Sequence, residues 1–281
     1  MGLIDFILNL AGLLLWLNWR SIRFDPLGKR TPATLVGTLR RAEPSRLRRW
    51  HLLAVLGALL LLRALFYWQI GSASKPVWAG TLDLNIIAPS FLSNSLGRML
   101  LFSIFSFGLT LGVFYLWLLL LSVLEGPEPI RQLVRMQLGG IDCWPRWTKL
   151  FLPLTVMALS WWLASWVLTL TWLGSIVPHP VSAAHRIEES LVIGLGSYLS
   201  WKYIVGVLLA LHLLNSYIYF GKHPFWSYVN AEARTLLWPL RAVPLCVGKV
   251  DFAPVAGIVL VFLFAELAER GLVALYLRLP L

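Results

Sequence analysis

GKVDFAP, at residues 248–254, opens an apolar segment that continues to residue 276. A second copy of the pattern, GGIDCWP at residues 139–145, stands just before another apolar segment. Both copies read glycine, any residue, a β-branched aliphatic residue, aspartate, two further residues and proline. The recurrence of one pattern at the entrance of two apolar segments predicts a chain built from repeats.

The composition indicates the class of protein. Hydrophobic residues make up 58% of the 281 residues and charged residues 13%, whereas about a quarter of a soluble domain is charged. A helix that crosses the apolar core of a bilayer needs about 20 apolar residues. Six segments have that character: residues 3–17, 50–70, 96–124, 150–173, 191–220 and 252–276. We therefore predict an all-α membrane protein with about six transmembrane helices. For the first segment, which is short and contains Asp5 and Asn9, an interfacial helix is the alternative.

The six segments pair into three predicted helical hairpins within a single membrane domain, residues 1–281. The repeat-like units are residues 1–70, 96–173 and 191–276, and Pro26, Pro127 and Pro224 recur just after the first segment of each unit. Each connecting loop contains a short amphipathic stretch that begins at a proline, which suits the first turn of a helix. These loop helices either lie in the cytoplasmic headgroup layer or pack on the protein.

Lysine and arginine are concentrated in alternate connections. Residues 18–49 contain nine of them, and residues 125–149 and 221–251 contain four each. Positive residues resist translocation, so these loops are predicted to be cytoplasmic and both termini to face outward. The net charge of +11 favours anionic lipid headgroups as partners. Nucleic acid is not expected as a partner because no recognition module accompanies the charge.

The third unit resembles the YggT family, also called YlmG, of small bacterial and plastid membrane proteins. The family pattern is roughly Thr-Glu-Pro, then Pro-x-Arg-Arg-x-x-Pro, then Gly-Gly-x-Asp-x-Ser-Pro before a transmembrane helix. The matching anchors are Glu232, Pro239, Arg241, Pro244, Gly248, Asp251 and Pro254. The chain departs from the pattern at Ala231, Ala233, Ala242, Lys249 and Ala253. In the middle unit the match is limited to Gly139, Gly140, Asp142 and Pro145.

The resemblance implies a divergent family member in the bacterial cytoplasmic (inner) membrane. Relatives are associated with cell division or nucleoid organisation, with ion or osmotic homeostasis, and with maturation of a haem-bearing cytochrome b. None of these is a catalytic activity. We therefore expect a non-catalytic scaffold or assembly factor, or an accessory subunit of a larger membrane complex, without a cofactor and with other membrane proteins as partners. The alternative is an ion channel or transporter involved in ion or osmotic homeostasis.

The motif residues also have a physical interpretation. Asp142 and Asp251 stand where an aspartate caps a helix N-terminus, and Pro145 and Pro254 fall in the expected first turn. The glycines of the motif provide a sharp turn at the helix entry. A contact of the two aspartates with a partner or ligand is the alternative role.

Charged residues inside apolar segments are costly unless they are paired. Arg63 and Glu266 lie at similar predicted depths, and Lys202 falls toward the outer half, so an ion pair of Glu266 with Arg63 or Lys202 is expected. The same residues would line a path if the protein transports ions.

Three other sets of residues have candidate structural or binding roles. Gly108 and Gly112 are predicted to form a close-packing helix face. His212 is expected to be a hydrogen-bonded buried histidine, with haem ligation as the alternative. Residues near the predicted outer side offer a metal site as the alternative to a solvated loop; they are His179, His185, Glu188 and Glu189.

The charge distribution makes a direct topology prediction. A single cysteine placed at Ser45 should be protected from a membrane-impermeant thiol reagent in intact cells, whereas one at Ser74 should react, because residues 18–49 are predicted to be cytoplasmic. The measurement is labelling before and after cell lysis. Labelling of position 45 but not of position 74 in intact cells would invert the topology.

Overall fold

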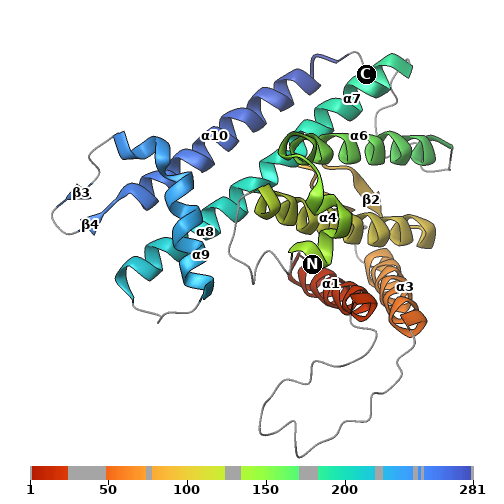
Figure 1. Ribbon diagram of the computed structural model, residues 1–281. Coiled ribbons are helices and arrows are strands. Elements are labelled where there is room, and N and C mark those ends of the chain that lie inside the picture. Colours follow the sequence, from red (N-terminus) through yellow and green to blue (C-terminus); the bar gives the residue numbers. More distant parts are fainter. Residues whose placement is uncertain are drawn as a thin grey trace, which may run out of the picture. The chain divides into compact units, whose positions relative to one another are not determined.

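The computed structural model describes residues 2–24, 49–73, 78–123, 134–170, 183–218, 224–242, 246–247 and 250–279 (Figure 1). This part of the chain is mostly helical, as predicted. Within it, four helical segments are long and apolar enough to cross a membrane: Gly2–Arg20, Trp50–Ala73, Leu96–Val123 and Ala183–Tyr217. The first amphipathic loop predicted from the sequence lies outside the described residues.

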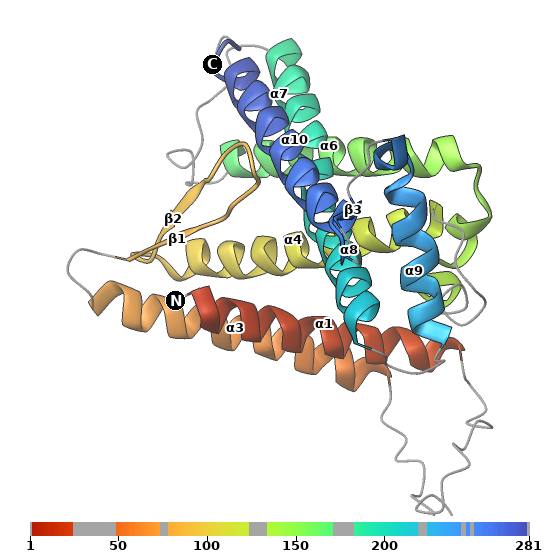
Figure 2. The ribbon, with the colours of Figure 1, turned by 90° about the vertical axis from the view of Figure 1, so that its left-hand side faces the viewer.

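The chain divides into two compact units, and the first contains Met1–Leu82 and Ser90–Gly112. Its helices are α1 (Gly2–Phe24), α3 (Arg49–Ala73) and the first part of α4 (Leu96–Val123). Helices α1 and α3 lie side by side (Figure 2). They are antiparallel, because Asp5 contacts Arg63 whereas Gly12, further along α1, lies against Leu56. The first apolar segment is thus a helix of 23 residues, longer than the predicted 3–17.

A short β-hairpin connects α3 to α4, and the sequence analysis did not predict it. Strands β1 (Ala79–Thr81) and β2 (Ser90–Leu92) pair antiparallel, with Gly80 opposite Phe91. Phe91 is buried against Phe102 of α4, and Phe102 also contacts the rings of Tyr67 and Trp78. The hairpin therefore closes an aromatic cluster over one end of α3 and α4.

The second unit contains Asp83–Pro89 and Val113–Leu281. Its longest element is a continuous helical run of 35 residues, Ala183–Tyr217, made of α7 (Ala183–Gly196), the 3₁₀ turn η2 (Ser197–Ser200) and α8 (Trp201–Tyr217). This run begins eight residues before the predicted start of the fifth apolar segment. The early start adds a polar beginning to the helix, in which His185 Nδ1 lies 3.0 Å from Glu188 Oε2.

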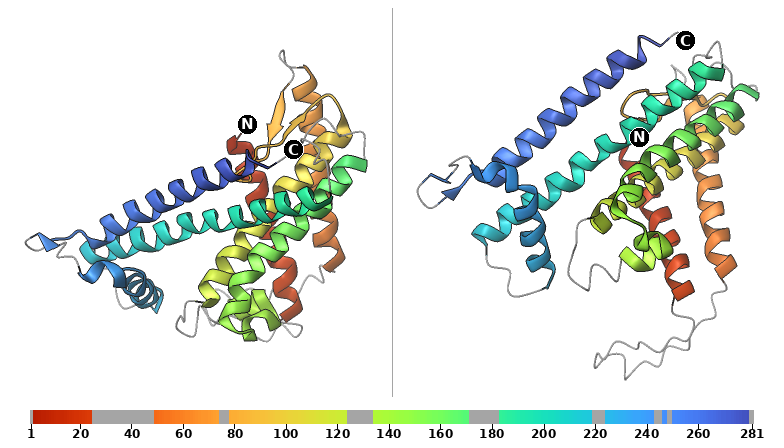
Figure 3. Two further views of the ribbon diagram at one scale, coloured as in Figure 1. Left: turned by 90° about the horizontal axis from the view of Figure 1, so that it is seen from above. Right: turned by 45° about the horizontal axis from the view of Figure 1, so that its top comes forward.

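Two helices pack along this run. Helix α6 (Arg146–Leu170) is antiparallel to α7, because Tyr198 donates a hydrogen bond to the Leu150 carbonyl at one end and Trp161 contacts Glu189 at the other. Helix α10 (Ala253–Tyr276) runs beside α8 and reaches α7 (Figures 2 and 3). Both helices are long, yet polar residues reduce their apolar character: Arg146, Lys149, Glu266, Glu269 and Arg270.

The amphipathic loop helix of the third unit is present as α9 (Pro224–Leu236), followed by the 3₁₀ turn η3 (Trp238–Ala242). Its apolar face is buried on α8, where Val229 packs with Leu208, and Ala233 with Leu209. In the middle loop, residues 134–138 are helical and pack on Leu118 and Leu119 of α4. Of the two sequence-based alternatives, packing on the protein holds for both segments.

The predicted repeat boundaries at residues 1–70, 96–173 and 191–276 differ from the boundaries of the two compact units, one of which falls inside α4. The most extensive packing of α6 is against α7, and that of α8 is against α10. A single membrane domain with three repeats remains a prediction from the sequence.

The glycines that bring helices together are not the predicted ones. A side chain added at Gly108 or Gly112 would meet no atom within 4 Å among the described residues, so the predicted close-packing face brings no described helices together. A Cβ at Gly194 of α7 would instead lie 2.9 Å from the Leu154 carbonyl oxygen and 3.2 Å from the Ala158 Cβ, both on α6. Gly194 therefore permits the close approach of α6 and α7.

We expect Gly194→Leu to destabilise the protein by about 1–3 kcal/mol, because the added side chain forces α6 away from α7. The matched control is Gly271→Leu, at a helical glycine of α10 with open space around it. That change should be neutral or slightly stabilising, since leucine favours helix more than glycine does. Thermal unfolding of the detergent-purified proteins measures both, and equal stabilities of the two variants would contradict the packing role.

Candidate functional site

The most deeply buried charged side chain of the first unit is Arg63, in the middle of α3. It is only 1% exposed. An arginine cannot lose its charge in a protein, so a buried guanidinium must find a counter-ion and hydrogen-bond acceptors. The surroundings of Arg63 provide both from two other helices.

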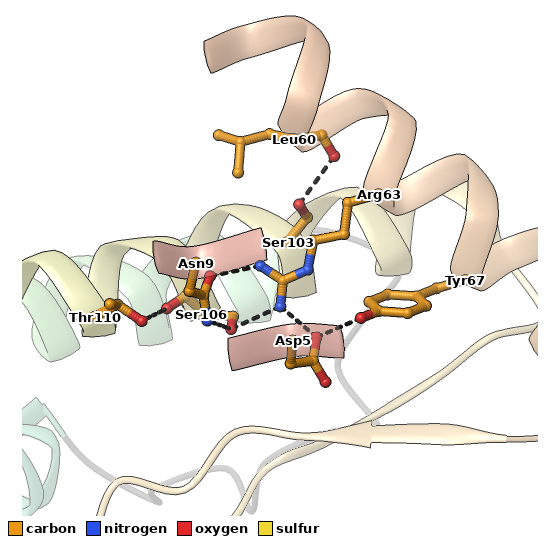
Figure 4. A network of polar contacts seen from close by, with 8 residues as sticks. All are labelled: Asp5, Asn9, Leu60, Arg63, Tyr67, Ser103, Ser106 and Thr110. Carbon is orange, nitrogen blue, oxygen red and sulfur yellow. Dashed lines mark hydrogen bonds and ion pairs between the residues drawn. The ribbon is translucent and has the colours of Figure 1, made fainter. Parts of the chain in front are cut away.

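Three polar side chains bind the guanidinium (Figure 4). Its Nη1 donates to Asn9 Oδ1 at 2.7 Å, and its Nη2 donates to Asp5 Oδ1 at 2.6 Å and to Ser106 Oγ at 2.9 Å. Asn9 in turn donates from Nδ2 to Ser106 Oγ at 3.1 Å. Asp5 and Asn9 lie four residues apart on one face of α1, and Ser106 belongs to α4. The network therefore joins α1, α3 and α4.

Tyr67 binds Asp5, the counter-ion of Arg63. It lies one helical turn after Arg63, is fully buried, and donates its hydroxyl to Asp5 Oδ1 at 2.6 Å. The same carboxylate oxygen thus accepts from a cation and from a phenol. The other oxygen of Asp5 points away from the network (Figure 4), and the Asp5 side chain is 21% exposed.

Aromatic rings enclose the guanidinium on its remaining sides. Its Cζ atom lies 5.6 Å from the centre of the Tyr67 ring and 5.4 Å from that of Phe102. A cation at this distance is attracted by the negative face of the ring. Ser103 of α4 also joins α3, because it donates to the Leu60 carbonyl at 2.9 Å, whereas the bond from Thr110 to the Ser106 carbonyl, at 3.0 Å, lies within α4. The arrangement neutralises and immobilises the charge of Arg63.

The predicted ion pair of Arg63 with Glu266 is wrong, because the counter-ion of Arg63 is Asp5. Asp5, Asn9, Tyr67 and Ser106 were not recognised as its ligands. Two signals in the sequence pointed to them: Asp5 and Asn9 share one face of an otherwise apolar helix, and Tyr67 follows Arg63 by four residues. Asp5 and Asn9 of α1 offer hydrogen-bond acceptors, and the Arg63 guanidinium of α3 needs them.

The other predicted intramembrane charges also have partners that differ from the prediction. Glu266 pairs with Arg270 on its own helix at 3.0 Å, where both side chains are exposed. Lys202 of α8 pairs with Glu269 of α10, also at 3.0 Å. Glu269 follows Phe262 by two helical turns, and Phe262 lies against Gly206 of α8, so Glu269 rather than Glu266 is on the face that meets α8.

Asp142 does not cap the fourth predicted helix. It lies in η1 (Gly139–Cys143), whereas α6 begins at Arg146, directly after Pro145. Its carboxylate accepts hydrogen bonds from Ser122 at 2.6 Å and from Arg135 at 3.1 Å, and Lys149 Nζ lies 3.5 Å away. The left-handed backbone of Gly139, with φ of 61°, provides the predicted turn. Asp142 therefore fastens the loop to α4 and α6.

In the third unit, Asp251 is also not the cap. It belongs to the two-residue strand β4 (Val250–Asp251), which pairs with β3 (Cys246–Val247), and the N-cap of α10 is Phe252. Pro254 lies in the first turn of α10, as predicted, and is buried. In neither copy of the pattern is the aspartate the N-cap residue of the helix that follows.

The remaining family-like residues are distributed over α9 and η3. Glu232 is buried on α9; burial, and after it the charge of Glu232, raises the pKa of Tyr228 above the ordinary value. Pro239 is exposed in η3, where Arg241 also lies. Pro244 and Gly248 lie outside the described residues, and Gly140 is exposed in η1.

The histidines and the proposed metal ligands are separated by the fold. His212 Nδ1 lies 2.8 Å from Asn230 Oδ1 of α9, which agrees with the predicted hydrogen-bonded histidine. His185 Nδ1 lies 3.0 Å from Glu188 Oε2 at the exposed start of α7. Glu189 instead points into the protein and is buried. His179 lies outside the described residues.

No protein-family model, no curated protein and no solved structure gives a significant match to this chain.

Asp142 provides a prediction about pH. Burial opposes its charge, but the hydrogen bonds from Ser122 and Arg135 and the charge of Lys149 outweigh burial and lower the pKa of the carboxyl group. A lowered pKa stabilises the fold above the unfolded-state value of about 3.9, and this stabilisation is lost as the pH falls through the folded-state value. We expect Asp142→Asn to cost about 2 kcal/mol at neutral pH and nothing in strong acid.

Thermal unfolding of wild type and variant as a function of pH tests this expectation. Asp83→Asn is the control, because Asp83 is exposed and asparagine retains the hydrogen bond from the Asn85 amide. The same loss of stability for Asp142→Asn at every pH would show that the charge of Asp142 is not what stabilises the loop.

Proposed function

We propose that this protein is a non-catalytic integral membrane scaffold or assembly factor that holds other membrane proteins. The observation that carries the proposal is the Arg63 network: a guanidinium on α3 that is 1% exposed is bound by side chains of two other helices, α1 and α4. Such a charge is immobilised between neutral and oppositely charged groups. It joins α1, α3 and α4, and its counter-ion is a fixed carboxylate of the protein, Asp5.

The second charged pair supports the same role. Lys202 and Glu269 connect α8 to α10 by a direct ion pair. Charges that conduct ions have to exchange partners along a path, whereas here each charge is bound by a specific neighbour. We therefore favour structural pairing over the alternative function of ion channel or transporter.

Two surfaces suit partners. Helix α10 exposes large apolar side chains such as Phe264 and Val259, which are 65% and 60% exposed and suit lipid tails or a neighbouring membrane helix. On the α9 side, Trp238 and Arg234 are exposed while the apolar face of α9 is buried on α8. We therefore place the docking surface for a partner or anionic lipid on the exposed side of α9 and η3, because the apolar face of α9 is already buried on α8.

The proposal includes a topology and a location. We infer six membrane crossings arranged as three hairpins, both termini outside, and residence in the cytoplasmic membrane of a bacterium. The basic loops and the resemblance to the YggT family support this assignment. An accessory role in a larger membrane complex follows from the same resemblance.

The test is affinity purification of the full-length protein in mild detergent with quantitative mass spectrometry. The variant Arg234→Glu/Arg241→Glu should lose partners that wild type retains, while a cooperative thermal unfolding transition shows that it remains folded. Arg270→Glu is the matched control, because Arg270 is an exposed arginine on a different helix. The control should retain the partners.

A measurement of ion flux in liposomes tests the alternative function of channel or transporter. Lys202→Met and Glu269→Gln remove the charged groups of the α8–α10 pair. Ion flux through the wild-type protein that disappears in these variants, with partners still bound to the charge-reversed protein, would contradict the scaffold and establish the channel or transporter.

A further inference from the structure

Glu189 is a buried carboxylic acid that the proposed scaffold does not use. It lies on α7 where Trp161 of α6 and Tyr276 of α10 meet it, and its exposure is 0%. The neighbouring Glu188 is exposed and pairs with His185. Two adjacent glutamates of one helix therefore have opposite environments, so one is a matched control for the other.

The hydrogen bonds to Glu189 are long and come from neutral groups. Its Oε1 accepts from Trp161 Nε1 at 3.3 Å and from the Tyr276 hydroxyl at 3.5 Å. Its Oε2 is buried without a hydrogen-bond partner among the described residues. Bonds to an ionised carboxylate are ordinarily shorter, at about 2.7–2.9 Å from a charged nitrogen donor. A hydroxyl group donates to an ionised carboxylate at about 2.5–2.7 Å, so the 3.5 Å contact from the Tyr276 hydroxyl suits a neutral acid better than an anion.

Arg186, one turn earlier on α7, is the cation that acts electrostatically on Glu189. Its buried Nε atom has no hydrogen-bond partner in the described part of the chain, so that atom does not bond to the carboxyl group. The other packed elements present an indole from α6 and a phenol from α10. Burying an ionised carboxylate without a bonded cation would cost several kcal/mol at such a site. Protonation of the carboxyl group removes this cost because the acid is then neutral.

We propose that Glu189 is a proton-binding site, a carboxylic acid that remains protonated at neutral pH between α6, α7 and α10. The proton is taken from water and resides on Oε2, while Oε1 accepts from Trp161 and Tyr276. Loss of the proton would leave an anion in an apolar contact, so water would enter and the end of α10 that carries Tyr276 would separate from α7. The proton therefore controls how the last turn of α10 is held. This inference is independent of the scaffold function.

Carbodiimide labelling tests the site in the full-length protein reconstituted in phosphatidylcholine vesicles. The apolar reagent dicyclohexylcarbodiimide reacts with protonated carboxyl groups, and mass spectrometry of peptides locates the adduct. We expect modification of Glu189 and not of Glu188 at neutral pH, declining as the pH rises. The adduct should be lost in Glu189→Gln and retained in Glu188→Gln.

Infrared spectroscopy provides a second measurement that does not depend on reagent access. The carbonyl stretching band of a protonated acid should be present in wild type and Glu188→Gln, absent in Glu189→Gln, and shifted in Tyr276→Phe because a hydrogen bond to Oε1 is lost. A wild-type spectrum in which Glu189→Gln removes only a carboxylate band would overturn the proposal. Equal labelling of Glu188 and Glu189 at neutral pH would also contradict it.

Discussion

The first unit depends on one constraint: Arg63 must keep its charge in the middle of an apolar helix. The guanidinium is neutralised by Asp5 and bonded to Asn9 and Ser106, so the requirement of one side chain on α3 fixes the position of α1 and of α4. Helix α1 has little other burial, since only 11% of its apolar window lies inside the protein. Apolar side chains gain little by leaving lipid for protein, so polar contacts and close packing have to hold such a helix.

In the second unit, too, polar contacts and close packing hold the helices together, but other residues provide them. Lys202 and Glu269 join α8 to α10 by an ion pair. Before the start of α6, Asp142 accepts hydrogen bonds from Ser122 and Arg135. Gly194 permits α6 to approach α7 closely. The apolar face of α9 is buried on α8, which leaves its polar face toward the surroundings. Internal charge pairing and a polar exterior loop together favour a protein that holds partners over one that conducts ions.

The helices were largely predictable, because the length of an apolar run and the bilayer thickness decide where a membrane helix can form. The early start of α7 was missed because its first turn is polar, and because the partners that bury Glu189, Trp161 and Tyr276, lie far from it in the sequence. Three-residue strands are too short to show alternation, so β1 and β2 left no signal. That Arg63 needs a partner was clear from the sequence, but depth along a helix does not specify the facing residue. Asp5 is the partner of Arg63 because α1 packs against α3. Glu269, and not Glu266, is the partner of Lys202 because the rotation of α10 about its axis places Glu269 toward α8.

A double-mutant cycle between Asp5 and Arg63 tests the central claim most directly. Asp5→Ala leaves a buried cation without its counter-ion and should cost about 3 kcal/mol of unfolding free energy. Adding Arg63→Met to Asp5→Ala should restore part of this loss, because no uncompensated charge remains, and the two changes should couple by about 2 kcal/mol. Unfolding of the purified protein in detergent by a denaturing surfactant gives the four free energies. Additive effects of the two substitutions would contradict the account, because they would show that α1 is not held by this ion pair.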